Sequence, residues 1–231
     1  MFPNKYSESL LTDVPEYLKS INKPPHLLHY RGDISLIHES KRVAVVGTRT
    51  PSTFGIEECR FITTWFVENG YTIISGLARG TDSIAHQTCI ETGGKTIAVL
   101  PSGLENIYPP ENQTLAERIV ESGGLLITEY PDHSSPRKQY FIQRDRLQSG
   151  LSLGVVIIES EQKSGTMHTA RFTIQQKRVL GCVEYDHGLD IPQTSGNTKL
   201  IKAGQAFGLN RDNLLVFEGM LREKLHSHKM S

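Results

Sequence analysis

One short stretch, YTIISGLARGTDSIAH at residues 71–86, combines residue types that bind a phosphate. Gly76 and Gly80 lack a Cβ atom, so the backbone N–H groups of their turn can approach an anion closely. Arg79 adds a positive charge between them, and a helix that begins near residues 81–82 would point its free N–H groups at the same place. The stretch therefore predicts a strand followed by an anion-binding turn.

The elements that would position this turn are visible in the hydrophobic pattern. Six apolar runs indicate strands, at residues 43–46, 72–75, 96–100, 125–128, 155–159 and 179–183. Between them apolar residues recur at helical spacing, as in residues 56–66 before the stop at Asn69-Gly70. Because the strands are apolar throughout and alternate with helices, we expect an α/β fold with a parallel or mostly parallel sheet of about six or more strands, covered by helices on both faces.

In such a sheet the ligand crevice lies outside the carboxyl ends of the strands. Small residues follow four of the predicted strands there: Gly47-Thr48-Arg49, Ser75-Gly76, Ser102-Gly103 and Ser164-Gly165-Thr166. We expect their N–H groups and hydroxyls to converge on one phosphate-bearing ligand. Each glycine taken singly is equally well explained as an ordinary turn residue.

A second group of residues lies between Pro136 and Ser152, which we expect to be a loop. It places four cations around two aromatic rings: Arg137, Lys138, Arg144 and Arg146 around Tyr140 and Phe141. Cations for a phosphate backbone and rings for base stacking are typical of single-stranded nucleic-acid binding. Asp145 reduces the net positive charge of this segment. The composition is equally consistent with a solvated basic loop whose two rings lie in the core.

Three familiar catalytic or nucleotide-binding motifs are excluded by their context. The GKT at residues 94–96 resembles the end of a Walker loop, but Cys89 replaces the first glycine and the segment leads from helix to strand. The GLSLG at residues 150–154 fits a nucleophile elbow but precedes a strand, so Ser152 is not a hydrolase nucleophile. No βα turn carries the dinucleotide fingerprint G-x-G-x-x-G.

Composition restricts the function further. The 231 residues include 25 basic and 25 acidic ones, so a phosphate must be recognised by a local patch. Three cysteines without metal-type spacing fit a reducing cytosol, and neither a signal peptide nor a membrane-length apolar run is visible. His26 and His29 have no third ligand candidate, so we expect no metal site. Taken together, these features predict a cytoplasmic, soluble protein without a cofactor.

Six segments, in this order, closely resemble the DNA-processing protein A (DprA/Smf) family: VAVVGTRTPSTFG, IISGLARGTDSIAH, GGKTIAVLPSGLENIYPPEN, LLITEYP, FIQRDRLQSGLS and SGTMHTARF. PPHLLHYRGDISL resembles the lead-in to the Rossmann-like domain of that family, and the resemblance covers about residues 24–206. It implies a Rossmann-like fold in a cytoplasmic protein that binds single-stranded DNA without cutting it. It also implies that the protein forms a homodimer and helps to load the RecA recombinase during DNA uptake or repair.

The resemblance also implies which residues contact DNA. Lys138, Phe141 and Arg144 keep the K-x-x-F-x-x-R arrangement of the family, with Phe141 as the base-stacking ring. The other expected DNA or phosphate contacts are Arg49, Gly47, Ser75, Gly76, Arg79, Gly80, Lys95, Arg146, Ser164, Gly165 and Thr166. No catalytic residue is expected.

Three domain segments follow from this comparison, together with three departures from the family pattern. Residues 1–40 would be a leading segment, residues 41–217 the Rossmann-like DNA-binding domain, and residues 218–231 a helical tail. Asp145 stands where the family usually has asparagine, and the run GCVEYDHG lacks the usual proline-glycine turn. No winged-helix-like domain is expected after residue 217, so recombinase loading is less strongly implied than DNA binding. Residues 213–225 are expected either to form a dimer contact or to close a sheet edge.

The alternative is a nucleotide sensor or a nucleotide-processing enzyme on the same scaffold. Phosphoribohydrolases that activate cytokinins resemble the chain at residues 164–166, but Thr169 stands in place of their catalytic glutamate. Asp82, Glu159 and His86 are the candidate acids or bases, and a helix cap for Asp82 and packing roles for the other two are the competing interpretation.

Overall fold

One sheet of nine strands organises the computed structural model, which describes residues 9–185 and 191–229. The strand order is β1-β2-β6-β5-β4-β3-β7-β8-β9. The strands are β1 (Ser9–Leu11), β2 (Leu28–Gly32), β3 (Arg42–Val46), β4 (Thr72–Ser75), β5 (Thr96–Val99), β6 (Leu125–Thr128), β7 (Gly154–Ile157), β8 (Val179–Val183) and β9 (Phe207–Leu209). Residues 1–8 of the leading segment, residues 186–190 in and after the GCVEYDHG run, and the last two residues lie outside the described part.

The pairing confirms the expected α/β class with a mostly parallel sheet. Every pairing among β3 to β9 is parallel, whereas β2 pairs antiparallel with both β1 and β6. All six predicted strands are present, while β1, β2 and β9 were not predicted. β2 was missed because its sequence, LHYRG, is mostly polar and only partly buried.

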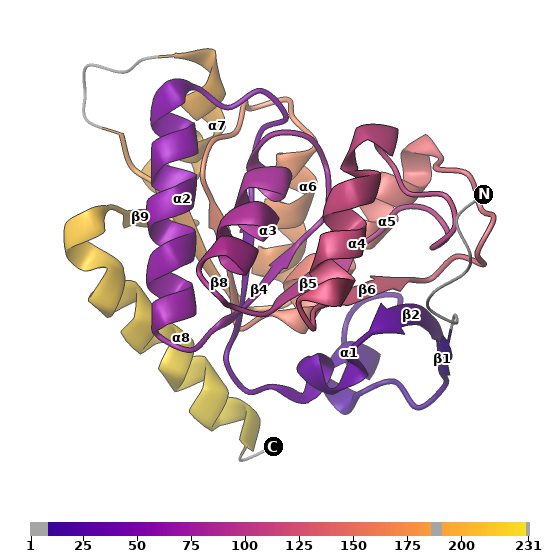
Figure 1. Cartoon of the computed structure of the whole chain (residues 1–231). Helices are drawn as coiled ribbons and strands as arrows, with labels where there is room; N and C mark the ends of the chain where they lie inside the picture. The colour runs from indigo at the N-terminus through magenta and orange to yellow at the C-terminus, as the bar shows by residue number, and fades with distance from the viewer. Residues whose placement is uncertain (1–8, 186–190, 230–231) are drawn as a thin grey trace.

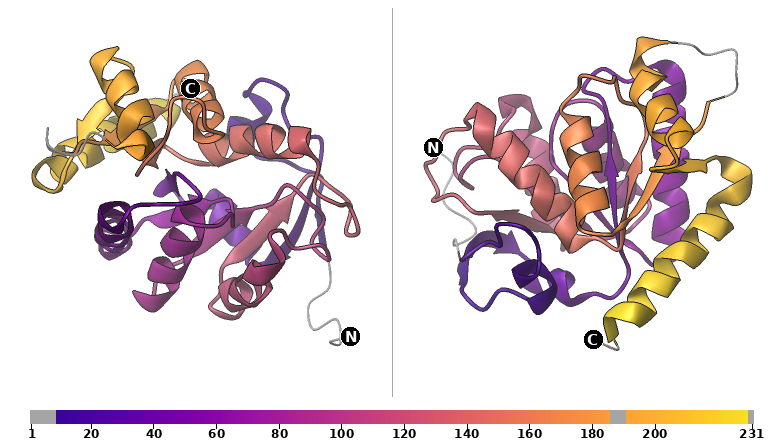
Figure 2. Two further views of the ribbon diagram at one scale, coloured as in Figure 1. Left: turned by 90° about the horizontal axis from the view of Figure 1, so that it is seen from above. Right: turned by 180° about the vertical axis from the view of Figure 1, so that it is seen from behind.

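Helices cover both faces of the sheet, as Figures 1 and 2 show. α2, α3, α4 and α8 lie on the face toward the viewer of Figure 1, and α1, α5, α6 and α7 lie behind. The helices are α1 (Glu16–Lys19), α2 (Thr53–Glu68), α3 (Thr81–Glu91), α4 (Gln113–Glu121), α5 (Lys138–Leu151), α6 (Thr166–Gln175), α7 (Ser195–Lys202) and α8 (Leu214–Lys229). Single 3₁₀ turns are η1 (Ile34–His38), η2 (Pro110–Asn112), η3 (Pro192–Thr194) and η4 (Arg211–Asn213).

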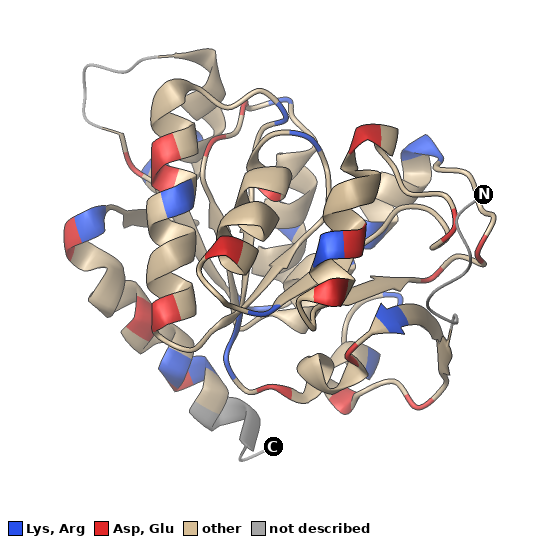
Figure 3. Ribbon diagram, viewed as in Figure 1, with Lys and Arg blue, Asp and Glu red and all other residues tan. Residues whose placement is uncertain are grey.

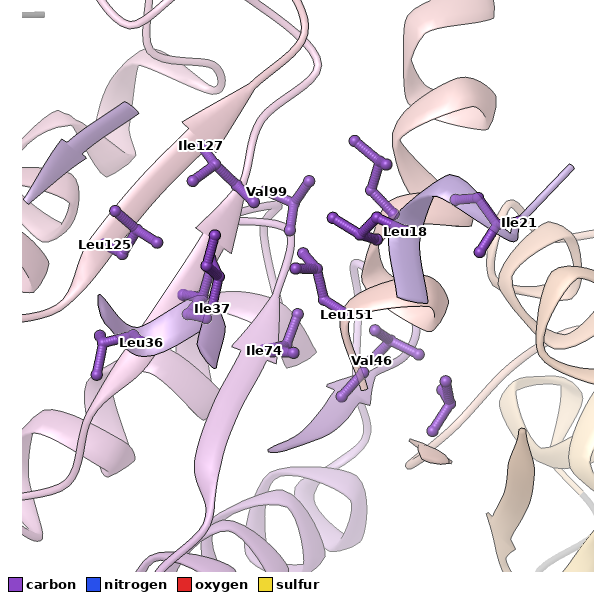
Figure 4. Packing of buried hydrophobic residues seen from close by; sticks show 14 of the residues in the cluster. Leu18, Ile21, Leu36, Ile37, Val46, Ile74, Val99, Leu125, Ile127 and Leu151 are labelled. Carbon is purple, nitrogen blue, oxygen red and sulfur yellow. The ribbon is translucent and has the colours of Figure 1, made fainter. Parts of the chain in front are cut away.

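The central strands are apolar throughout because successive side chains enter different cores. Val46 and Ile74 pack behind the sheet, where Figure 4 shows them with Leu18 and Ile37 of the leading segment. Val43 and Val45 face the other way, in a cluster that includes Phe217 of α8. Burying one such large side chain stabilises the fold by about 1.5–3 kcal/mol.

Both end segments contribute to these cores. The described part of the leading segment adds β1 and β2 to the sheet and packs Leu18 and Ile37 in full burial. α8 begins at Leu214, so the helix crosses the boundary expected after residue 217. Phe217 and Leu221 of this helix are fully buried against the sheet.

The expectation of a loop at residues 136–152 was wrong, because most of this segment is helix α5. The second half of α5 is buried on all sides and includes the polar residues Arg144, Asp145, Arg146 and Gln148, so apolar residues do not recur clearly at helical spacing. The change matters for function, since a helix fixes which of its side chains share a face.

Candidate nucleic-acid interface

A cleft of about 710 Å³ opens outside the carboxyl ends of the central strands. The turns after β3 and β4 and the segment between β7 and α6 line it, and α5 lies across its back. The chain order reverses here, because β4 and β7 pair with opposite sides of β3. This is the place where open α/β sheets bind ligands, and the cleft volume falls within the usual range for such sites.

Three cations at the mouth of the cleft are free to meet an anion. Arg49, Lys138 and Lys163 are all exposed cleft residues. No salt bridge within residues 9–185 and 191–229 engages any of the three. Glu161 is an exposed carboxylate of the same cleft, so the three cations outnumber it by two. Both signs of charge are interspersed over the view of Figure 3.

An aromatic pair lies beside these cations. The half-buried ring of Phe141 has its centroid 5.6 Å from that of Tyr108, in an edge-to-face arrangement. The Arg49 guanidinium carbon lies 5.3 Å from the centroid of Phe141. Rings next to a cation suit a nucleotide, since a base can stack on the ring while its phosphate meets the charge.

The glycine turn after β4 is a structural support, which corrects two expected phosphate contacts. The Gly76 N–H donates to Asp82 Oδ2 at 3.1 Å, so it is not free for a ligand. Gly76 is required because a Cβ atom there would lie 1.1 Å from Nη1 of Arg144. Ser75 is fully buried and its hydroxyl donates to the Val45 carbonyl at 2.7 Å, away from the cleft.

Arg79, at the end of the same turn, borders the ligand space, whereas Gly80 packs against the turn after β3. Gly80 has φ 71°, and a Cβ atom there would approach the carbonyl groups of Thr48 and Arg49 within 2.7 Å. Arg79 lines a smaller hollow of about 150 Å³ that also borders Arg49. Its charge is shared, because it forms an ion pair with Glu111.

The segment before α6 opens directly onto the cleft. Gly165 precedes the helix without a side-chain cap, and a Cβ atom there would meet nothing within 4 Å. Thr166 donates its hydroxyl to the Gly47 carbonyl at 3.0 Å, which joins this segment to the turn after β3. The Ser164 hydroxyl is buried without a hydrogen-bond partner among the described residues. Free N–H groups at the start of a helix are suited to bind a phosphate.

Buried charges form the floor of the cleft. Arg144 is only 5% exposed, and its guanidinium lies 3.7 Å from Asp82 and 3.4 Å from Asp145. Burial raises the pKa of Asp145 to about 7, an effect that Arg144 opposes and Asp82 increases. Burial likewise raises the pKa of Asp82 against the influence of Arg144. Arg144 thus holds the floor together instead of offering a free charge.

Two other expected DNA contacts lie outside the cleft. Lys95 immediately precedes β5, at the amino ends of the strands, and its ammonium group donates to the Ser122 carbonyl at 2.7 Å. Arg146 points away from the cleft and forms a two-fold hydrogen-bonded ion pair with Glu129, with both N–O distances 2.6 Å. The structure therefore places both residues away from the expected site. The position of Lys95 before the predicted strand at residues 96–100 already indicated the amino end of the sheet, whereas the helix face on which Arg146 lies could not be predicted from an expected loop.

Only three of the four predicted turns meet at the cleft. The turns at Gly47, Gly76 and Ser164 border the cleft or its smaller neighbour, and Ser102-Gly103 borders neither. A Cβ atom on Gly103 would lie 2.0 Å from the Asp132 carbonyl, since the segment after β6 covers this turn.

The candidate acids and bases have structural contacts. Glu159 is fully buried and accepts the Ser52 N–H at 2.8 Å, beside the start of α2. His86 is fully buried, with Nδ1 2.7 Å from Thr96 Oγ1, and burial lowers its pKa to about 3. Asp82 accepts the N–H of Gly76. No group of three potential metal ligands occurs in residues 9–185 or 191–229, and none of the helices found there is long and apolar enough to span a bilayer.

Tyr108, Lys163, His168 and Gln148 line the cleft but were not expected there. Lys163 directly precedes the predicted Ser164-Gly165-Thr166 turn, so the charge next to that turn was an available signal. Tyr108 comes from a loop between β5 and α4, and nothing in its local sequence relates it to Phe141.

The arrangement matches a known family along most of the chain. Residues 9–217 match the family described as DNA recombination-mediator protein A. The chain belongs to this family. It is 36% identical to the DNA processing protein DprA of Bacillus subtilis over 190 residues, covering 82% of this chain and 63% of that protein. It is also 36% identical to the protein Smf of Synechocystis, covering 90% of this chain and 52% of that protein.

Solved structures of the same family agree with the fold. The DNA processing protein A of Helicobacter pylori, described with a single-stranded DNA binding mode, superposes with a TM-score of 0.85 at 29% identity, over 95% of this chain and 98% of that chain. The DprA structure from Streptococcus pneumoniae gives a TM-score of 0.82 at 32% identity, over 92% of this chain and 74% of that chain. The chain therefore shares the DprA/Smf fold, and it spans just over half to about two thirds of the two curated relatives named above.

Proposed function

We propose that the cleft binds single-stranded DNA without cleaving it. The observation that carries this proposal is the set of three exposed cations, Arg49, Lys138 and Lys163, which line the same cleft as the half-buried ring of Phe141 and form no salt bridge among the described residues. The cations would meet the phosphate backbone and the ring would stack on an unpaired base. Arg79, Gly47 and the residues at the start of α6, Ser164, Gly165 and Thr166, would complete the phosphate path.

Three further roles belong to the same proposal. Loading of the RecA recombinase is supported by the description of the family as a recombination mediator. Homodimerisation is supported by two apolar side chains on α8, Leu215 and Val216, which are 70% and 58% exposed. A non-enzymatic role is supported by the structural contacts of Asp82, Glu159 and His86, and a cytoplasmic location is proposed because the proposed ligand is DNA.

A binding titration tests the central proposal. Labelled single-stranded DNA, a blunt duplex of the same length and a mononucleotide are each titrated at 50 mM and 200 mM salt. We expect the single strand to bind most tightly and its affinity to fall as salt rises, because bound cations release counterions from the phosphates. Equal affinity for the duplex, or affinity that does not change with salt, would overturn the proposal. Chemical change of any of these ligands during incubation would indicate an enzyme instead.

A further inference from the structure

Helix α5 presents a graded row of side chains to the cleft. Lys138, Phe141, Asp145 and Gln148 follow one another at spacings of three and four residues, so they share one face of the helix. Their exposure decreases along the row: Lys138 is exposed, Phe141 is half-buried, Asp145 is 8% exposed and Gln148 is 1% exposed. The row therefore runs from the mouth of the cleft to its floor.

This order fixes what a bound nucleotide would touch. A phosphate at Lys138 and a base stacked on Phe141 direct the edge of that base inward, toward the next side chain of the row. That side chain is Asp145, four residues beyond Phe141, where neighbouring Cβ atoms are about 5–6 Å apart. The floor of the cleft thus faces the hydrogen-bonding edge of the base.

Asp145 offers that edge an acceptor. Its oxygen Oδ1 lies 3.4 Å from Nε of Arg144. Oδ1 also accepts a hydrogen bond from the side-chain nitrogen of Gln148 at 3.2 Å, when that amide turns its nitrogen toward Asp145. The Gln148 oxygen then accepts the N–H of Gly76 and Nη1 of Arg144, so both ends of this amide are used. No hydrogen bond of the described residues engages Oδ2 of Asp145, whose side chain stays 12% exposed.

We propose that Asp145 selects bases that carry an exocyclic amine at C4 of a pyrimidine or C6 of a purine, which are cytosine and adenine, over thymine and uracil. An ionised carboxylate only accepts hydrogen bonds. Cytosine N4 and adenine N6 donate to it, whereas thymine and uracil (O4) and guanine (O6) present a carbonyl oxygen at that position, which repels it. The inference rests on the proposed function, since it requires a single strand in the cleft.

The test compares two oligonucleotides that differ only at the relevant edge. Oligodeoxycytidylate and oligodeoxyuridylate of twelve nucleotides share the ring size, the backbone and the absence of a methyl group. Binding is measured at pH 8, where Asp145 is mostly ionised because burial raises its pKa only to about 7. We expect the cytosine strand to bind about tenfold more tightly, the order of one good base-edge contact.

The matched variant is Asp145→Asn, whose amide can pair with either base. We expect it to bind both strands with affinities within about twofold of each other, and its thermal melting shows whether it is folded. The variant Lys95→Ala leaves Asp145 and its neighbours unchanged, since Lys95 lies outside the cleft, so it should retain the cytosine preference. Equal and tight binding of both strands by the parent would overturn this inference alone, as would an unchanged preference in folded Asp145→Asn. Failure of the parent to bind either strand would overturn the proposed function as well.

Discussion

Individual cations of α5 differ in what they touch, and this difference decides which can bind DNA. Lys138 is exposed at the cleft mouth, Arg144 is buried between two carboxylates, and Arg146 is paired with Glu129. All three looked equivalent in the sequence. Arg144 and Arg146 are two positions apart, which places them on opposite sides of a helix.

The first prediction concerns the free charges. Arg49→Ala and Lys138→Ala should each weaken single-stranded DNA binding for every sequence and make the salt dependence shallower by about one unit of slope, because each removes one phosphate contact. Lys95→Ala is the matched control, since this lysine lies at the opposite end of the strands and should leave both affinity and slope unchanged. Titration at four salt concentrations measures the slopes. A loss in Lys95→Ala equal to that in Arg49→Ala would contradict this assignment.

The second prediction separates stacking from charge. Phe141→Ala removes an aromatic surface worth about 1–3 kcal/mol per stacked base, so affinity should fall while the salt slope stays nearly constant. Phe141→Tyr keeps a ring and should bind within a few-fold of the parent. The same titrations report both values. If Phe141→Ala changed the salt slope as much as Arg49→Ala does, the loss of affinity would be caused by displacement of the neighbouring Arg49 and not by loss of stacking.

The third prediction follows from the pKa of Asp145, which burial raises to about 7. Below pH 7 the carboxyl is neutral, and above pH 7 it adds a negative charge to the cleft. Affinity for oligothymidylate should therefore rise about fivefold as pH falls from 8 to 6, the order expected of one nearby charge in a partly solvated site. The free energy of unfolding should also fall as pH rises toward 7. The reason is that the folded state, where burial raises the pKa of Asp145, holds this proton more tightly than the unfolded state does.

The neighbours of Asp145 provide the controls for this pH effect. Arg144, Asp82 and Arg49 face it, and His168 also lines the cleft. His168→Gln, which removes another ionisable side chain of the cleft, is therefore compared with Asp145→Asn. We expect the pH effect to persist in His168→Gln and to disappear in Asp145→Asn; the reverse result would assign it to the histidine.

At the scale of elements, the sequence predicted the central strands but not the helix that lines the cleft. Val43 to Val46 and Ile73 to Ile74 are apolar because both faces of the sheet are buried, and this signal is local. α5 buries polar groups whose partners lie on distant segments, such as Glu129 for Arg146, and pairings of this kind are absent from a local hydrophobic pattern. β2 was missed for a related reason, since it is a polar strand that pairs with β6 across a long sequence separation.

The turn after β4 gives a prediction at this scale. Gly76→Ala should destabilise the fold by about 1–3 kcal/mol or more, because its methyl group would overlap the buried Arg144 guanidinium. Gly165→Ala is the control: its methyl group enters open space at an ordinary backbone angle, so stability should change little. Thermal melting compares the two variants. An equal melting temperature for Gly76→Ala and the parent would show that Arg144 does not occupy this position in solution.

At the scale of the whole molecule, net charge gives no indication of the site, since basic and acidic residues balance. The site arises from topology, which brings the turn after β3, the segment before α6 and one face of α5 to the same edge of the sheet. The sequence predicted this edge from the order of strands and turns. It did not reveal that Tyr108 joins Phe141 there, because that contact depends on the path of the loop between β5 and α4.

The most direct test of the account is the selectivity of a double variant, Arg49→Ala with Phe141→Ala. In the parent, a single strand should bind well ahead of a blunt duplex of equal length, because only an unpaired base can stack on Phe141. In the folded double variant, single-strand affinity should fall to the level of the duplex, while Lys95→Ala keeps the selectivity of the parent. A double variant that melts like the parent and still prefers the single strand by the same factor would contradict the account, since DNA would then bind outside this cleft.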